Sequence, residues 1–149
     1  MSFPQITVYE LLTAGIILVI CTVADIRRNE IVFIPCFAGV LISLFFPQKN
    51  LMSSIGGALL GFVPLFVSAL LGSGGGGDAI VAASVGFIFP LTNATYIFLL
   101  ASTAYAFVLG IAVLISKNNK KQLPYIPFLS GSWVAISVLS VIQNGGISL

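Results

Sequence analysis

Two aspartates are the residues of this chain whose type and placement point most directly to chemistry. Asp25 and Asp78 are the only aspartates among 149 residues, and each borders a long apolar segment. A carboxylate beside hydrocarbon is costly, so acidic residues at membrane depth commonly mark functional sites. Asp78 also ends a glycine run, Gly72-Ser73-Gly74-Gly75-Gly76-Gly77. We therefore interpret Asp25 and Asp78 as a candidate catalytic pair at the edge of a membrane.

A pair of aspartates can hydrolyse a peptide bond without another reactive group. When two carboxyl groups lie within hydrogen-bonding reach, like charges disfavour ionisation of both, so the pair shares one proton. The ionised member can then take a proton from water while the protonated member polarises the peptide carbonyl. This is aspartic proteolysis, and it requires neither a metal ion nor an organic cofactor. We expect no metal and no cofactor here.

The glycines before Asp78 suit such a site. Residues without Cβ let another backbone approach closely, so Gly75, Gly76 and Gly77 are candidate substrate-binding residues. The run precedes an apolar segment, which places Asp78 near the N-terminus of a helix. The helix dipole there favours the ionised carboxylate, whereas burial disfavours it. The sequence leaves the balance between these two effects open.

The composition is that of an integral membrane protein. The chain is 58% hydrophobic and 7% charged, with a mean hydropathy of +1.15. A soluble domain of this length needs a far more charged surface. The length favours one compact bundle, so we expect residues 1–149 to form a single membrane-embedded domain, with the lipid bilayer and no nucleic acid as its partner. The first apolar segment lacks a preceding basic stretch and a following cleavage site, so we expect it to be retained rather than removed as a signal peptide.

Apolar periodicity and length predict an all-α fold of six transmembrane helices. A helix needs about 20 apolar residues to cross the hydrocarbon. The predicted spans cover residues 6–24, 31–46, 51–71, 79–91, 94–116 and 124–142. The fourth span would reach only about 20 Å, well short of the roughly 30 Å required. Either Leu91-Thr92-Asn93 or Asp78 should therefore lie within the membrane.

The basic residues predict the orientation of the bundle. Five of the six lie in the first and fifth loops, and Lys49 alone lies on the opposite side. Because excess lysine and arginine mark the cytoplasmic side, both termini should face away from the cytoplasm. The two aspartates should then share the cytoplasmic face. The five residues are Arg27, Arg28, Lys117, Lys120 and Lys121.

Four further features receive structural interpretations. Cys21 and Cys36 lack the spacing of a zinc site and are expected to be small buried residues. Trp133 is expected to supply lipid-facing or helix-packing bulk, and Glu10 to reach water on the outer side. The small residues Gly56, Gly57, Ala58 and Gly61 are expected to allow close helix packing.

Other roles for the aspartates stay open at this point. Asp78 alone could be an ordinary helix cap, and Asp25 alone could be a solvated acid that balances the following arginines. As a pair they could instead bind a cation in a small ion- or proton-coupled transporter, with the glycine run as a broken helix. A non-catalytic membrane scaffold is a third alternative. No motif specifies an oligomeric state.

Three motifs resemble a known family. Gly75-Gly76-Gly77-Asp78 matches the Gly-x-Gly-Asp signature of intramembrane aspartyl proteases. Asp25-Ile26-Arg27-Arg28 is similar to the first-aspartate motif of type IV prepilin peptidases. Pro124-Tyr125-Ile126-Pro127-Phe128 resembles the proline-phenylalanine element that opens the last core helix of that family. Across essentially its whole length the chain resembles the short, stand-alone prepilin peptidases.

This resemblance implies a specific activity. Asp25 and Asp78 would be the catalytic pair, and the enzyme would remove a short basic leader from prepilins or pseudopilins after a glycine, at the cytoplasmic face of the plasma membrane. Larger relatives carry an extra cytoplasmic domain that methylates the new amino terminus; nothing here corresponds to it, which implies cleavage without methylation. Two positions depart from the usual pattern: Ile31-Val32-Phe33 replaces an Ile-Pro-Asn step, and Ile80 replaces a common lysine.

Overall fold

The fold is all-helical over the part of the chain that the structure describes. The computed structural model describes residues 6–28, 33–46, 50–71, 76–115 and 125–144, and these contain helices and no β-strand. The helices are α1 (Val8–Arg28), α2 (Phe33–Ser43), α3 (Leu51–Leu70), α4 (Gly76–Ile88), α5 (Leu91–Ile115) and α6 (Ile126–Asn144). The predicted fold class and the existence of six apolar helices are thus confirmed.

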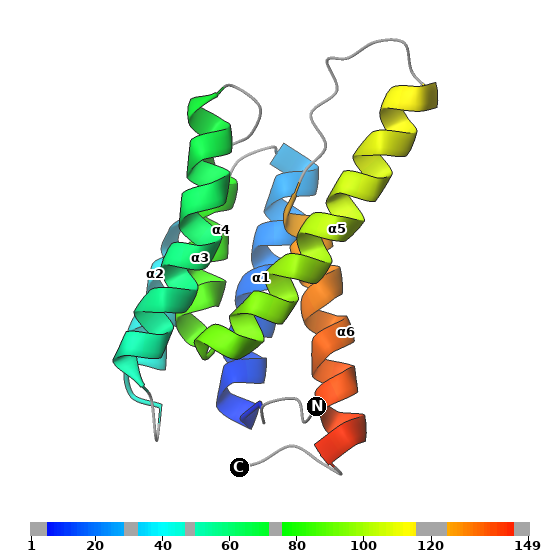
Figure 1. Ribbon diagram of the computed structural model, residues 1–149. Coiled ribbons are helices and arrows are strands. Elements are labelled where there is room, and N and C mark those ends of the chain that lie inside the picture. Colours follow the sequence, from blue (N-terminus) through cyan, green and yellow to red (C-terminus); the bar gives the residue numbers. More distant parts are fainter. Residues whose placement is uncertain (1–5, 29–32, 47–49, 72–75, 116–124, 145–149) are drawn as a thin grey trace.

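The helices alternate in direction along the bundle. In Figure 1, α1 begins and α6 ends at the same end, whereas α1 ends and α4 begins at the opposite end. The two aspartates therefore lie at one common end, because Asp25 is near the end of α1 and Asp78 near the start of α4.

The short apolar helix α4 is the centre of the bundle. It contacts each of the other five helices, most extensively α3. Its buried side chains point in several directions around the helix, from Ala79 and Val81 to Val85 and Ile88. A helix that is apolar all round is expected to be buried on all sides. The residues that follow the glycine run form α4 and are therefore packed against all five other helices.

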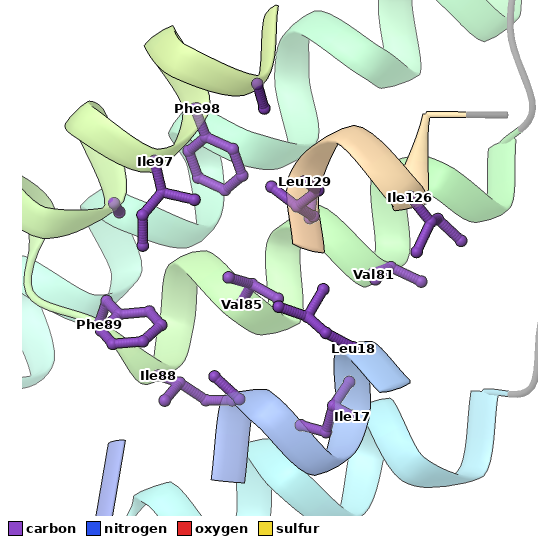
Figure 2. Close-up of a cluster of buried hydrophobic side chains, with 14 of the residues drawn as sticks. Ile17, Leu18, Val81, Val85, Ile88, Phe89, Ile97, Phe98, Ile126 and Leu129 are labelled. Atoms are coloured by element: carbon purple, nitrogen blue, oxygen red, sulfur yellow. The ribbon is translucent and has the colours of Figure 1, made fainter. Parts of the chain in front are cut away.

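The core joins α4 to the helices on either side of it. Ile17 and Leu18 of α1 reach Val85 and Ile88 of α4, as Figure 2 shows. On the other side of α4, side chains from α5 and α6 complete the cluster; these are Ile97, Phe98, Ile126 and Leu129. Each of these eight side chains is at least nine-tenths buried.

Small residues bring α3 and α4 into backbone contact, as predicted. A Cβ on Gly57 would collide with the Gly86 carbonyl, and a Cβ on Gly86 would collide with the Gly57 carbonyl. A Cβ on Gly61 would lie 2.7 Å from the Ala82 carbonyl oxygen. Gly56 differs, since a Cβ there would only touch Leu91 at an ordinary 3.4 Å. The reciprocal glycine contact fixes how closely α3 approaches α4.

Several helix limits differ from the prediction. The fourth helix begins at Gly76 rather than at residue 79, and α1 continues to Arg28, so both aspartates lie inside helices. Pro90 ends α4 because it lacks an amide donor, and its carbonyl accepts from Ala94 N at 3.0 Å in the first turn of α5. The predicted inter-helix residues Thr92 and Asn93 therefore belong to α5. Pro127 lies in the first turn of α6 as expected, and Pro124 lies outside the described residues.

The predicted position of Glu10 in water is wrong. Only 8% of the side chain is exposed, because it closes the N-terminus of α1. Thr7 N donates to Glu10 Oε2 at 3.0 Å, and Glu10 N donates to Thr7 Oγ1 at 3.3 Å. This reciprocal arrangement is a capping box, which satisfies two backbone donors that a helix start leaves unpaired.

Trp133 has the helix-packing role that was expected of it. Its ring lies on Gly15 of α1, where an added Cβ would come within 2.9 Å of the indole. The contact joins α1 to α6.

In the part of the chain that the structure describes, three helices are long and apolar enough to cross a membrane, namely residues Val8–Asp25, Leu51–Leu70 and Leu91–Ile111. Three shorter apolar helices accompany them, at Phe33–Ser43, Gly76–Ile88 and Ile126–Ile142. The count of six membrane crossings and the orientation of the termini stay predictions. Lys49, Lys117, Lys120 and Lys121, on which the orientation depends, lie outside the described residues.

The glycine contact between α3 and α4 gives a direct test of the packing. Gly86→Ala should lower the free energy of unfolding by about 1–3 kcal/mol, because a methyl group forces the two backbones apart. Gly110→Ala is the matched control, since nothing lies within 4 Å of a Cβ at that position. Thermal unfolding in detergent measures both variants. Equal effects of the two substitutions would contradict the close approach.

Candidate active site

Asp25 lies on the face of α1 that is directed into the bundle. Leu18 and Cys21, seven and four residues earlier, are fully buried, and residues at this spacing share one face of a helix. The Asp25 side chain is half-buried, and its Oδ2 atom is buried without a hydrogen-bond partner among the described groups. A buried polar atom without a partner requires an explanation, and a functional role is one of those that occur.

Asp78 is held by the central helix. It is the third residue of α4, and Val81 and Ala82, three and four residues later, are fully buried. Its carboxylate is therefore placed on a bundle-facing side of the first turn, where the helix dipole favours negative charge. The prediction that Asp78 lies near a helix N-terminus is confirmed.

The fold brings the two aspartates together. Their carboxylates lie near enough for the charge of Asp25 to act on Asp78. The chain reaches this arrangement from two segments 53 residues apart, through the end of α1 and the start of α4. The juxtaposition is a feature of the fold, while the catalytic role of the pair stays a prediction.

The glycines flank this pair on one side. Gly76 and Gly77 form the start of α4, and a Cβ at Gly76 would meet nothing within 4 Å. Gly75 lies outside the described residues. Gly76 thus provides open space next to Asp78, as a substrate-binding surface requires, and that role stays a prediction for all three. Ile80, at the position where a lysine is common, packs against the apolar core.

Two tyrosines near Asp78 complete the site, and sequence reasoning missed them. The charge of Asp78 acts on the hydroxyl groups of both Tyr105 and Tyr125. The two rings meet edge to face with centroids 5.5 Å apart, and Tyr105 makes a similar contact with Phe128. Tyr125 is 5% exposed, and its hydroxyl lies 3.4 Å from Ser102 Oγ.

A signal for these tyrosines was present in the sequence. Tyr125 is part of the proline-phenylalanine element, and Ser102 and Tyr105 are polar residues three apart in an apolar helix. Polar residues at that spacing share one helix face. Their position next to Asp78 depends on how α5 packs, which the spacing does not define.

The two cysteines are buried, as expected. Their sulfur atoms lie 3.7 Å apart between α1 and α2, and both are free thiols. Across the described parts of the chain, no three His, Cys, Asp or Glu side chains gather where they could hold a metal ion.

Comparison with known protein families identifies the family to which the chain belongs. The model of the type IV leader peptidase family, Peptidase_A24, matches residues 12–115. The chain belongs to the type IV leader peptidase family. No curated protein and no solved structure matches it.

Membership in the leader peptidase family has three consequences for the site. The matched residues include Asp25, Asp78 and all of α1 to α5 except the first turn of α1, whereas the Tyr125 element lies beyond them. The family supports a peptidase and gives no support to the transporter alternative. Together with the long apolar helices, it identifies the chain as a membrane protein.

Tyr125→Phe tests whether the tyrosine hydroxyl contributes to this leader peptidase site. Loss of the hydroxyl should lower the rate of leader cleavage up to about tenfold, because one buried hydrogen-bonding group near Asp78 disappears. Tyr9→Phe is the control, since Tyr9 is 16 residues from Asp25 on the same helix, or about 24 Å away. Initial rates of cleavage of a leader-bearing substrate measure both. Equal rates for the two variants would remove Tyr125 from the site.

Proposed function

We propose that this protein is an intramembrane aspartic endopeptidase in which Asp25 and Asp78 activate a water molecule. The observation that carries the proposal is the proximity of the two carboxylates at the common end of α1 and α4. Like charges rarely gather in an apolar bundle without a functional reason, and a leader peptidase requires a group that activates water.

The chemistry follows from one proton shared between the two acids. The ionised carboxylate accepts a proton from water as the water oxygen attacks the carbonyl carbon of the scissile bond. The other carboxyl group donates its proton to the carbonyl oxygen. When the tetrahedral intermediate collapses, the carbon–nitrogen bond breaks and a proton passes to the leaving amine. The pair titrates as a unit, so neither acid is assigned the proton permanently.

The residues around the two aspartates support these separate acid and base roles. Gly76 offers a surface without side chains beside Asp78, along which an extended peptide can lie. The hydroxyl groups of Tyr105 and Tyr125 lie within range of the charge of the same carboxylate, and each can donate a hydrogen bond. Donors placed where charge develops stabilise the transition state of acyl transfer. Neither a metal ion nor an organic cofactor takes part in this mechanism.

The proposed substrates are type IV prepilins or pseudopilins. Family membership and the resemblance of the Asp25 and Asp78 motifs support removal of their basic leader peptide. We place the site at the cytoplasmic face of the plasma membrane, on the basis of the predicted distribution of basic residues. Residues 1–149 would act as a single peptidase domain.

Removal of either acid tests the mechanism. Asp25→Asn and Asp78→Asn should each lower the rate of cleavage by at least about 10²–10⁴-fold, because the remaining carboxyl group cannot both accept and donate the proton. The assay is the mobility shift of a co-expressed prepilin, followed over time in membranes.

Glu10→Gln provides the matched control for the same acid-to-amide change. Glu10 lies at the opposite end of α1, 15 residues from Asp25, so this variant should cleave at nearly the wild-type rate. Full cleavage by either aspartate variant would overturn the dyad, and cleavage of no prepilin by the wild type would overturn the proposed substrate.

A further inference from the structure

A cavity between α3 and α5 lies beside the proposed site. It has a volume of about 210 Å³ and is lined mainly by apolar side chains. Leu60 and Pro64 of α3 and Leu99 of α5 are among the lining residues, and all three are also exposed on the outside of the bundle. The cavity is therefore reached from the surface that the apolar helices present to their surroundings.

The cavity borders the helix that carries Asp78, because Gly61, which lines it, packs against the Ala82 carbonyl, one helical turn after Asp78. Tyr125 lines the cavity, and the charge of Asp78 acts on that same hydroxyl group. Ser102, whose Oγ lies 3.4 Å from the Tyr125 hydroxyl, also lines the cavity. One side chain thus belongs both to the wall of the cavity and to the surroundings of Asp78.

The walls of the cavity also include polar groups that suit a peptide. Pro64 lies inside α3 and has no amide hydrogen, so the Leu60 carbonyl lacks its usual helical donor. Leu60 and Pro64 both line the cavity. A hydrocarbon tail offers nothing to this acceptor or to the hydroxyl groups of Ser102 and Tyr125, whereas the backbone N–H and C=O groups beside an entering apolar side chain can form hydrogen bonds with such groups.

The volume indicates what kind of side chain would fit. A dry apolar cavity of about 150 Å³ is large enough to hold benzene. The cavity here can therefore hold one bulky apolar side chain, aromatic or branched, but not a folded segment. Its apolar lining excludes the basic residues of a leader.

We infer that this cavity is a substrate subsite that holds one bulky apolar side chain from the first residues after the scissile bond. The inference rests on the proposed function, because it needs a peptide positioned at Asp25 and Asp78. The leader stays outside the cavity, and the apolar segment that follows the cut enters between α3 and α5. The subsite thus selects for a large side chain near the cleavage point.

Filling the cavity tests the inference. Leu99→Trp adds bulk from α5, and Leu60→Trp does so independently from α3. Leu100→Trp and Leu59→Trp are matched controls, because each neighbour is exposed and does not line the cavity. The probes are synthetic peptides with a basic leader, a glycine before the cut and an apolar segment. In each peptide one of the first six residues after the cut is either phenylalanine or alanine.

The expected result is a change in side-chain preference at one position. For the purified protein in detergent, Leu99→Trp and Leu60→Trp should lower kcat/KM for the phenylalanine peptide by about tenfold or more relative to the alanine peptide. The control variants should keep the wild-type ratio. The contrast between paired peptides separates loss of the subsite from a general loss of folding.

Other results would overturn the inference in distinguishable ways. An unchanged ratio at all six positions, or an equal loss for phenylalanine and alanine peptides, would show that the cavity holds no substrate side chain. A rate that depends on the acyl-chain length of added phospholipid, with an unchanged ratio, would assign the cavity to a lipid. If the wild type cleaves none of the peptides, the proposed function fails and the subsite fails with it.

Discussion

Repulsion between two carboxylates in an apolar bundle is the interaction on which the rest of this structure depends. Asp25 and Asp78 approach closely enough for their charges to interact, although each could have stayed in water. Such an arrangement persists only if the surrounding packing enforces it, since like charges at short range are costly. The fully buried residues one turn away from each acid, Cys21 and Ala82, supply that packing. In the proposed mechanism, one proton shared by the pair would relieve the repulsion and provide the acid and the base of hydrolysis.

The central helix α4 holds Asp78 in its place near Asp25. Because α4 contacts every other helix, the position of Asp78 cannot shift without disturbing the core in Figure 2. The Gly57–Gly86 contact holds α4 against α3, and the cavity lies between α3 and α5 next to this contact, because Gly61 both lines the cavity and packs against Ala82. Tyr125 then joins that cavity to Asp78. The acids, the glycine contact and the cavity are thus parts of one packing arrangement.

The sequence predicted the features that depend on the properties of short stretches of the chain. Apolar length predicted the helices, and the cost of an acid beside hydrocarbon singled out Asp25 and Asp78. Glycine spacing predicted the close approach of α3 and α4. The start of α4 at Gly76 was missed because glycine is unfavourable in a helix, by about 0.5–1 kcal/mol relative to alanine, so the glycine run indicates a loop. Glu10 was misplaced because the four-residue capping box from Thr7 to Glu10 was overlooked. The positions of Tyr105 and of the cavity depend on packing between helices that no local pattern defines.

The central claim is that Asp25 and Asp78 lie close together in the folded protein, at the common end of α1 and α4. Cross-linking tests it most directly: Asp25→Cys and Asp78→Cys are combined in a background with Cys21→Ala and Cys36→Ala, and membranes are treated with a short bifunctional thiol reagent. The structure predicts rapid cross-linking of this pair, measured by intact mass, and little for Val23→Cys with Asp78→Cys, because Val23 lies on the exposed face of α1. Equal cross-linking of the two pairs, or none between positions 25 and 78, would contradict the account.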